Sequence, residues 1–201
     1  MNSQGKFMKR LIWVSAAFFI LAVAALLVID QARQSRAAVP VLGQLPDFTF
    51  TERSGRAFGL ADMKGRINVV DFIFTRCKGP CPIMATKMGE LYELYDSSSK
   101  VQFISISVDP EYDSLTVLQA YAERQGVTDN RWVFLHGAID SVVNLSENGF
   151  KIAADDLPGG HTTRFILVDQ KGRIRGYYDG LDDASLGIMK THIRQLAGET
   201  P

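Results

Sequence analysis

Runs of apolar residues predict a mixed α/β domain in the second part of the chain. Residues 68–74 are nearly all apolar, and residues 102–108 contain the run FISISV, as expected of central parallel strands buried on both faces. Between them, residues 82–95 repeat apolar side chains at the spacing of one helix face. The pattern therefore predicts a β-α-β unit at the centre of the domain.

Further elements flank this unit. A hairpin is expected at residues 48–58, around the turn Ser54-Gly55-Arg56. Asp113 is expected to cap the next helix and Gly126 to end it. The remaining pattern predicts helices at 113–124, 139–148 and 184–196, and strands at 132–135, 163–168 and 173–178. This order resembles a thioredoxin-like α/β fold, with a central sheet, flanking helices and an added N-terminal β-hairpin.

Residues 11–29 form a run of nineteen residues without a charge. At about 1.5 Å per residue, a helix of this length nearly spans a hydrocarbon core of roughly 30 Å. We therefore expect one transmembrane anchor at 11–29, a cytoplasmic N-terminus at 1–10, a tether at 30–45 and a folded domain at 46–201. A cleaved signal peptide is the alternative, although its apolar region is typically only about 7–15 residues long.

The charges suggest where the domain lies. Lys6, Lys9 and Arg10 precede the apolar run with no acid among them, which favours a cytoplasmic N-terminus and an exported domain. With no long Arg- and Ser-rich presequence, a single-pass protein of the bacterial inner membrane with a periplasmic domain is expected. Beyond residue 36 the chain has 17 basic and 21 acidic residues, a composition that argues against nucleic-acid binding.

Cys77 and Cys81 are the only cysteines, and they lie between the strand 68–74 and the following helix. Because Pro82 suits the first helical position and disfavours a helical Cys81, we expect both cysteines in a tight loop before the helix. Free backbone N–H groups there favour thiolates, so an exposed pair of low pKa is expected. The pair can also form a disulfide, and a purely structural disulfide is the alternative interpretation.

A third group decides between thiol exchange and metal binding. His161 follows two glycines and precedes the strand 163–168, which in a thioredoxin-like sheet lies beside the cysteine loop. Two thiolates and an imidazole suit Cu(I) and tolerate Cu(II). On spacing alone, however, a lone loop histidine is more often not a ligand. His136 and His192 are expected to be surface or packing residues, and Met84 and Met88 are expected to fill the core.

Three motifs carry a family likeness: Phe74-Thr75-Arg76-Cys77-x-x-x-Cys81-Pro82, then Ser107-Val108-Asp109-Pro110-Glu111-Tyr112-Asp113, then His161-Thr162. Together they resemble the Sco/SenC family over residues 46–197. The resemblance implies a membrane-anchored, thioredoxin-like protein that binds copper through Cys77, Cys81 and His161. It also implies a redox-active cysteine pair and a partner in cytochrome c oxidase subunit II, whose CuA centre such proteins help to assemble, or in a related copper oxidase.

The resemblance leaves two mechanisms open. A metallochaperone delivers copper to the partner and itself needs a copper donor. A thiol-disulfide oxidoreductase reduces the partner's cysteines and itself needs a thiol reductant. The chain departs from the family pattern at Lys78-Gly79-Pro80, where Pro-Asp-aliphatic is usual, and at Gly159-Gly160, where Val-Asp is common. Asp109 is a candidate for indirect support of the site. A peroxiredoxin-like peroxidase is excluded by Phe74 at the position of its threonine, and a copper sensor that transfers no copper remains an alternative.

Overall fold

The computed structural model describes residues 3–34, 38–154 and 157–198, and it divides the chain into two compact units, 1–38 and 39–201. In the first unit, α1 (Ser3–Gln34) is one continuous helix whose apolar side chains between residues 12 and 27 are exposed. No helix in the described ranges combines the length and the apolar character needed to cross a membrane. The transmembrane helix expected at residues 11–29 is therefore not supported.

The second unit is built on one eight-stranded sheet of order β1-β8-β7-β4-β5-β6-β2-β3. Its centre is β4 (Ile67–Ile73), which runs parallel to β5 (Val101–Ser107) and antiparallel to β7 (Arg164–Val168). Outside these lie β6 (Trp132–His136), parallel to β5, and β8 (Arg173–Asp179), antiparallel to β7. This topology confirms the mixed α/β sheet that the apolar runs predict.

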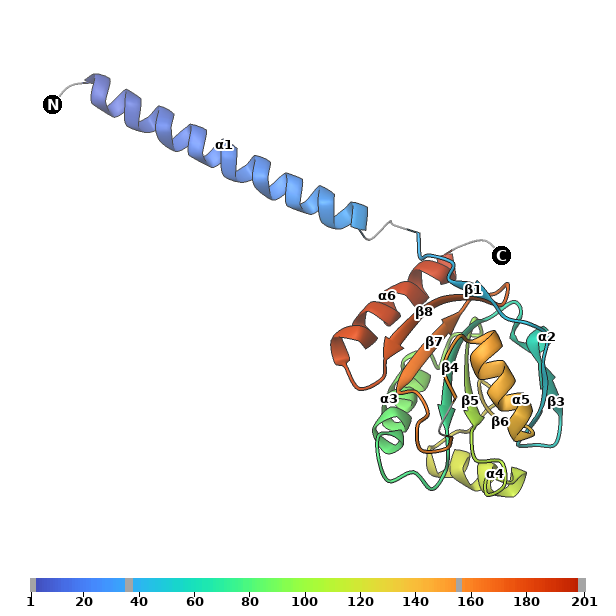
Figure 1. Cartoon of the computed structure of the whole chain (residues 1–201). Coiled ribbons are helices and arrows are strands. Elements are labelled where there is room, and N and C mark those ends of the chain that lie inside the picture. Colours follow the sequence, from blue (N-terminus) through green and yellow to red (C-terminus); the bar gives the residue numbers. More distant parts are fainter. Residues whose placement is uncertain (1–2, 35–37, 155–156, 199–201) are drawn as a thin grey trace. The chain divides into compact units, whose positions relative to one another are not determined.

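Helices cover both faces of the sheet (Figure 1). The core on one face joins the sheet to α3 (Cys81–Leu94), α4 (Leu115–Arg124) and α6 (Asp183–Gly198). The core on the other face includes α2 (Leu60–Met63), α5 (Ile139–Asn144) and the π-helical turn η1 (Leu145–Gly149). The helix expected at 139–148 thus changes from α to π hydrogen bonding after Asn144. Met84 and Met88 are buried in the first core, as predicted.

The expected hairpin is present at the edge of the sheet. Its strands β2 (Thr49–Glu52) and β3 (Ala57–Gly59) are antiparallel, and Gly55 turns between them with a φ of 89°. β2 also pairs with β6, which attaches the hairpin to the central sheet. The hairpin is therefore an extension of the sheet and not a separate subdomain.

The folded unit begins earlier than the expected residue 46. Val39 and Leu45 are buried, and β1 (Gly43–Gln44) pairs with β8 in a region expected to be tether. A two-residue strand leaves almost no periodic signal, and its partner Ile174 is far along the chain. The boundary between tether and domain therefore lies near Val39.

The start of α4 also differs from the expected one. Ser114 is the N-cap, and its hydroxyl accepts a hydrogen bond from the Val117 N–H. Asp113 does not cap the helix, because its buried carboxylate accepts hydrogen bonds from Thr75 and Ser107 instead. The end of the helix is as predicted, since Gly126 follows it with a φ of 73°, a conformation that glycine adopts without strain.

Candidate metal centre

The two cysteines lie where β4 ends and α3 begins. Cys77 is in the connecting loop, and Cys81 is the first residue of α3, not the last residue of the loop as expected. The reason is that the first helical hydrogen bond runs from the Met84 N–H to the Pro80 carbonyl, so Pro82 occupies the second helical position. A carboxyl strand end next to a helix N-terminus is a common ligand site in α/β sheets.

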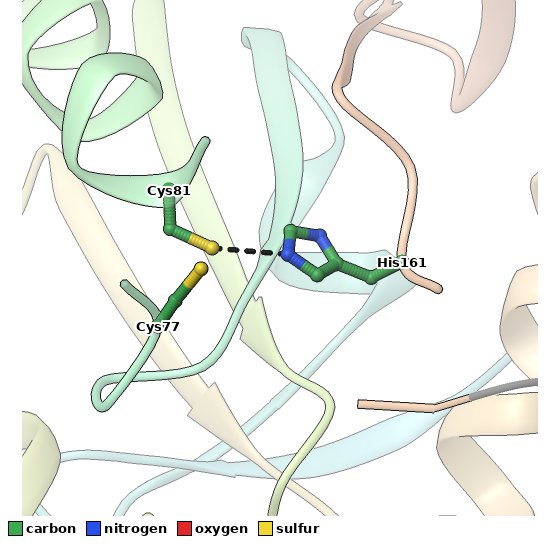
Figure 2. Close-up of side chains that lie close together, drawn as sticks. All are labelled: Cys77, Cys81 and His161. Carbon is green, nitrogen blue, oxygen red and sulfur yellow. Dashed lines mark hydrogen bonds between the residues drawn. The ribbon is translucent and has the colours of Figure 1, made fainter. Parts of the chain in front are cut away.

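His161 completes the cluster from the loop that leads into β7, the antiparallel neighbour of β4. Figure 2 shows the two sulfurs and the imidazole turned toward one another. The ligand atoms of Cys77, Cys81 and His161 all lie within 4.8 Å of each other. Within the described ranges no other three His, Cys, Asp or Glu side chains gather in this way. The sheet thus brings together the three residues that the sequence singles out.

The imidazole is held in the form that a metal needs. His161 Nδ1 lies 3.1 Å from the Thr162 carbonyl, which can only accept, so Nδ1 carries the proton. Nε2 therefore has a free lone pair, and it lies 3.0 Å from Cys81 Sγ (Figure 2). His161 is 8% exposed, and burial lowers the pKa of its imidazole, despite the hydrogen bond to the Thr162 carbonyl. At neutral pH the ring is thus uncharged and ready to coordinate.

The two thiols have different surroundings. Cys77 is half-buried, and its sulfur accepts a hydrogen bond of 3.4 Å from the Gly79 N–H. Cys81 is 2% exposed, and burial, together with a hydrogen bond to Cys77, raises its pKa to about 12. The expected exposed pair of low pKa is therefore wrong for Cys81. Burial outweighs the helix N-terminus, and a bound cation would favour the thiolate form of Cys81.

A network of acids anchors the loop in front of Cys77. The Asp113 carboxylate, which is fully buried, accepts hydrogen bonds from the Thr75 N–H and hydroxyl and from the Ser107 hydroxyl at 2.7 Å. Next to it, Arg76 donates from Nε to Asp109 at 2.6 Å. Asp109 thus supports the loop indirectly, in agreement with the sequence interpretation. The sequence pattern does not reveal the role of Asp113, because its partner Thr75 is 38 residues away along the chain.

Asp71 is a second residue whose importance the sequence pattern conceals. It lies in β4, is 1% exposed, and alternates with Val69 and Ile73, which belong to the core that includes α3. Besides burial, its negative charge is one of the causes that raise the pKa of Cys81.

Burial raises the pKa of Asp71 itself to about 7, although Ser105, its partner in register on β5, hydrogen-bonds its side chain. Its Oδ1 atom has no partner within the described residues. Apart from Asn68 the rest of this strand is apolar, so the charged residue within it is the signal that could have revealed Asp71.

The other histidines lie elsewhere. His136 Nδ1 donates to the Asp113 carbonyl at 3.0 Å, and His192 Nδ1 is hydrogen-bonded to the Tyr178 hydroxyl at 2.6 Å. Neither ring belongs to the Cys77–Cys81–His161 cluster. Both are therefore packing residues, in agreement with the sequence interpretation.

The cluster has the donors and the spacing for a thiophilic metal ion. Metal bonds of about 2.3 Å to sulfur and about 2.0 Å to nitrogen place ligand atoms roughly 3.5–4 Å apart. Cys81 and His161 therefore need to separate by less than about 1 Å from their hydrogen-bonded distance to admit an ion. Soft sulfur ligands with one imidazole select copper or zinc over magnesium or calcium.

Known proteins share this sequence and fold. The family model described as SCO1/SenC matches residues 42–197. The SCO1 protein homolog of Bacillus subtilis is 31% identical over 150 residues, covering 72% of this chain and 78% of that protein. The thiol-disulfide oxidoreductase ResA of Geobacillus thermodenitrificans is 29% identical over 146 residues, covering 72% of each.

Solved structures agree. A SCO1/SenC family lipoprotein from Bacillus anthracis superposes with a TM-score of 0.72 at 32% identity, over 80% of this chain and 99% of that chain. The structure of BsSco, described as a member of the Sco family of cytochrome c oxidase assembly proteins with a disulfide switch, gives a TM-score of 0.69 at 26% identity over 80% and 98%. With a thioredoxin-like fold, the three-residue cluster and a family match over most of its length, this chain belongs to the SCO1/SenC family.

Proposed function

We propose that this protein binds one copper ion through Cys77, Cys81 and His161 and uses it to assist assembly of a copper oxidase. The partner would be cytochrome c oxidase subunit II, at its CuA centre, or a related oxidase. The observation that carries the proposal is the convergence of two sulfurs and one imidazole nitrogen within 4.8 Å. Family membership and the description of the similar BsSco as an oxidase assembly protein support it.

The donor set fits copper as a transported ion. Two thiolates and one neutral imidazole satisfy Cu(I) with three ligands, and copper would lower the pKa of the Cys81 thiol enough to release its proton. Two of the ligands are buried, whereas Cys77 is half-buried. A ligand of the partner can therefore approach the ion beside Cys77, and copper can move by exchange of one ligand at a time.

Titration of the reduced full-length chain with Cu(I) under anaerobic conditions tests the proposal. We expect one equivalent to bind tightly, and His161→Ala to weaken binding at least tenfold. His192→Ala is the matched control, because it removes an imidazole outside the cluster. Wild-type affinity in the His161→Ala variant would contradict the assignment. Mixing the loaded chain with an apo CuA domain then shows whether copper moves to the partner.

Thiol-disulfide exchange is a second candidate, favoured by the contrast between the two thiols. Cys77 has an accessible sulfur with a backbone donor, whereas Cys81 is buried beside it. In this reaction the Cys77 thiolate attacks a partner disulfide and releases one partner thiolate. The Cys81 thiol then gives its proton to the released partner thiolate and attacks Cys77 Sγ, which frees the second partner sulfur as a thiolate and leaves a Cys77–Cys81 disulfide. The likeness to ResA, a thiol-disulfide oxidoreductase, supports this alternative.

The two candidates differ in their dependence on His161. If the physiological reaction is reduction, His161→Ala keeps its rate of disulfide reduction within about threefold, because the imidazole is not a nucleophile in the exchange. If it is copper delivery, the same variant fails to restore a CuA centre even when its thiols are reduced. Two mixtures separate these outcomes. Copper-free, reduced chain mixed with an oxidised apo CuA domain measures disulfide reduction. Copper-loaded chain mixed with a reduced apo CuA domain measures copper delivery.

The location remains a proposal from the sequence. We place the protein at the bacterial inner membrane, as a single-pass protein with residues 1–10 in the cytoplasm and the folded domain in the periplasm. The support is the uncharged run 11–29 and the basic residues before it. Protease treatment of spheroplasts should degrade the domain, and alkaline carbonate should leave the chain in the membrane pellet. Release of an intact, shortened chain into the periplasm would favour a cleaved signal peptide instead.

A further inference from the structure

Phe74 lies between the sheet and the metal centre and supplies no ligand atom itself. It is the first residue after β4, and its side chain is partly buried against the core that includes α2, α5 and η1. The Phe74 carbonyl accepts a hydrogen bond of 3.2 Å from the Cys77 N–H. The backbone of Phe74 therefore shapes the cysteine loop, which leaves the role of its aromatic ring to be explained.

The ring of Phe74 packs against the imidazole of His161. The two ring centroids are 5.3 Å apart, and the ring planes are nearly perpendicular, at 88°. This edge-to-face arrangement is one that aromatic pairs favour, and it stabilises the pair beyond the burial of its area. A phenyl ring has no hydrogen-bonding atom, so it does not compete for the lone pair of Nε2. The contact can thus hold the imidazole and leave its ligand atom available.

The hydrogen bond at Nδ1 cannot by itself fix the imidazole relative to the sheet. Its acceptor is the carbonyl of Thr162, which follows His161 in the same loop and moves with it. On the other side of the ring, Nε2 lies 3.0 Å from Cys81 Sγ, but a metal ion between these two atoms would replace that hydrogen bond. The contact with Phe74, which directly follows β4, can persist whether or not the site is loaded.

We propose that Phe74 is a positioning residue for copper binding, because its ring holds the His161 imidazole with Nε2 turned toward the two sulfurs. The inference rests on the copper site proposed above and adds to it a residue that does not touch the ion. Without the ring, the imidazole is less ordered, and ordering it on binding lowers the affinity. Copper affinity should fall by about three- to tenfold, in line with the strength of a single aromatic pair.

A double-mutant cycle of Cu(I) affinities, measured anaerobically on the reduced full-length chain in detergent, tests this role. Phe74→Leu keeps an apolar side chain in the core and keeps the backbone bond to Cys77, but it removes the ring. With His161 present, the change should weaken copper binding. In a His161→Ala background, it should change the affinity by less than about 1.5-fold, because the ring acts through the imidazole. Equal losses in the two backgrounds would overturn the proposal.

NMR of the copper-free, reduced chain tests the positioning without a metal. The ring current of Phe74 should displace the signals of the carbon-bound imidazole protons of His161, which His161→Ala identifies. Phe74→Leu should return them toward the positions of a histidine in an unfolded chain. Phe74→Tyr keeps the ring, so it should keep the displaced signals and retain wild-type copper affinity. Imidazole signals that do not move in Phe74→Leu, or an equal loss of affinity in both variants, would contradict the proposal.

Phe48→Leu is the matched control. Phe48 is also partly buried against the same core, but its ring packs against Phe50. The change should leave copper affinity and the His161 signals at their wild-type values. Failure of the proposed function is seen separately, because an unaltered chain that binds no copper contradicts the copper site itself. The imidazole signals then still report whether Phe74 orients His161.

Discussion

Cys77 and Cys81 have the same side chain but very different environments, and this difference controls how the cluster can react. The sulfur of Cys77 is accessible and receives a backbone hydrogen bond, whereas that of Cys81 is buried against His161. Only the thiolate form attacks an electrophile or binds a metal. Cys81 therefore depends on a partner group, either a metal ion or an oxidised Cys77, before it reacts.

Alkylation measures this asymmetry. At pH 8 iodoacetamide should modify Cys77 at least tenfold faster than Cys81, because burial raises the pKa of Cys81 to about 12. The rates can be read by mass spectrometry in the Cys81→Ser and Cys77→Ser variants. Equal rates in the two variants would show that the environments do not differ as described. Unfolding in urea should abolish the difference and serves as the control.

Asp71 predicts an unusual dependence of stability on pH. Burial raises its pKa to about 7 from the ordinary aspartate value of 3.8, which it regains on unfolding, so the folded state holds the proton more tightly. The free energy of unfolding is therefore unaffected by this group below pH 4 and decreases as the pH rises from there through 7. The Asp71→Asn variant lacks this loss, so it should gain stability over the wild type between pH 4 and 8, by up to about 4 kcal/mol.

Urea unfolding at pH 4, 6 and 8 measures this gain. Asp140→Asn is the control, since that acid is exposed in the first turn of α5. A difference between Asp71→Asn and wild type that stays constant over this range would mean that Asp71 ionises normally. A buried carboxyl that costs stability at neutral pH and acts on the pKa of Cys81 is typical of a functional position.

At the scale of elements, the loop between β4 and α3 is fixed by residues from the loop between β5 and α4. The Asp113 carboxylate binds both donors of Thr75, two residues before Cys77. Replacing Asp113 with alanine leaves these donors and the Ser107 hydroxyl without an acceptor in a buried site. We expect a loss of about 2–4 kcal/mol in unfolding free energy and weaker copper binding.

Ser114→Ala is the matched comparison for that variant. It removes the N-cap of α4 next to Asp113 and should cost only about 1 kcal/mol. Because none of the hydrogen bonds of Ser114 within the described residues reaches the cysteine loop, copper affinity should stay at the wild-type value. Equal losses of copper affinity in the two variants would place the effect in α4 and not in the loop. Denaturant unfolding and Cu(I) titration of each variant supply the two readouts.

The elements nearest the site could be predicted from the sequence because their signals are local. β4, α3 and β5 are each within one residue of the expected ranges, since apolar periodicity determines them. Cys77 and Cys81 stand out by their spacing, but His161 needs the family resemblance, because a lone histidine has no pattern.

Other features could not be predicted because they depend on contacts between distant residues. The hydrogen bonds of Asp113 to Thr75 and the pairing of β1 with β8 join segments whose partners a sequence pattern does not indicate. The raised pKa of Cys81 depends on how completely the fold buries it, which outweighs the expected effect of the helix end.

At the scale of the whole molecule, the boundary at Val39 can be tested by truncation. A chain that begins at Val39 should unfold at nearly the same temperature as the full-length protein, because it keeps the whole second unit. A chain that begins at Pro46 loses the buried side chains of Val39 and Leu45, each contributing about 1.5–3 kcal/mol. It also loses β1 and should melt several degrees lower. Equal melting temperatures of the chains that begin at Val39 and at Pro46 would show that the folded domain begins at residue 46.

The way the chain enters the folded unit has a mechanical consequence. Arg175, buried in β8, donates to the carbonyls of Val39 and Pro40 and to Asp169, and the Leu42 N–H bonds to the Ile174 carbonyl. Tension applied through residues before Val39 is therefore resisted first by these hydrogen bonds to β8. None of the contacts named here involves the loop that holds Cys77, so we expect the chain to be anchored to the domain independently of the copper ligands.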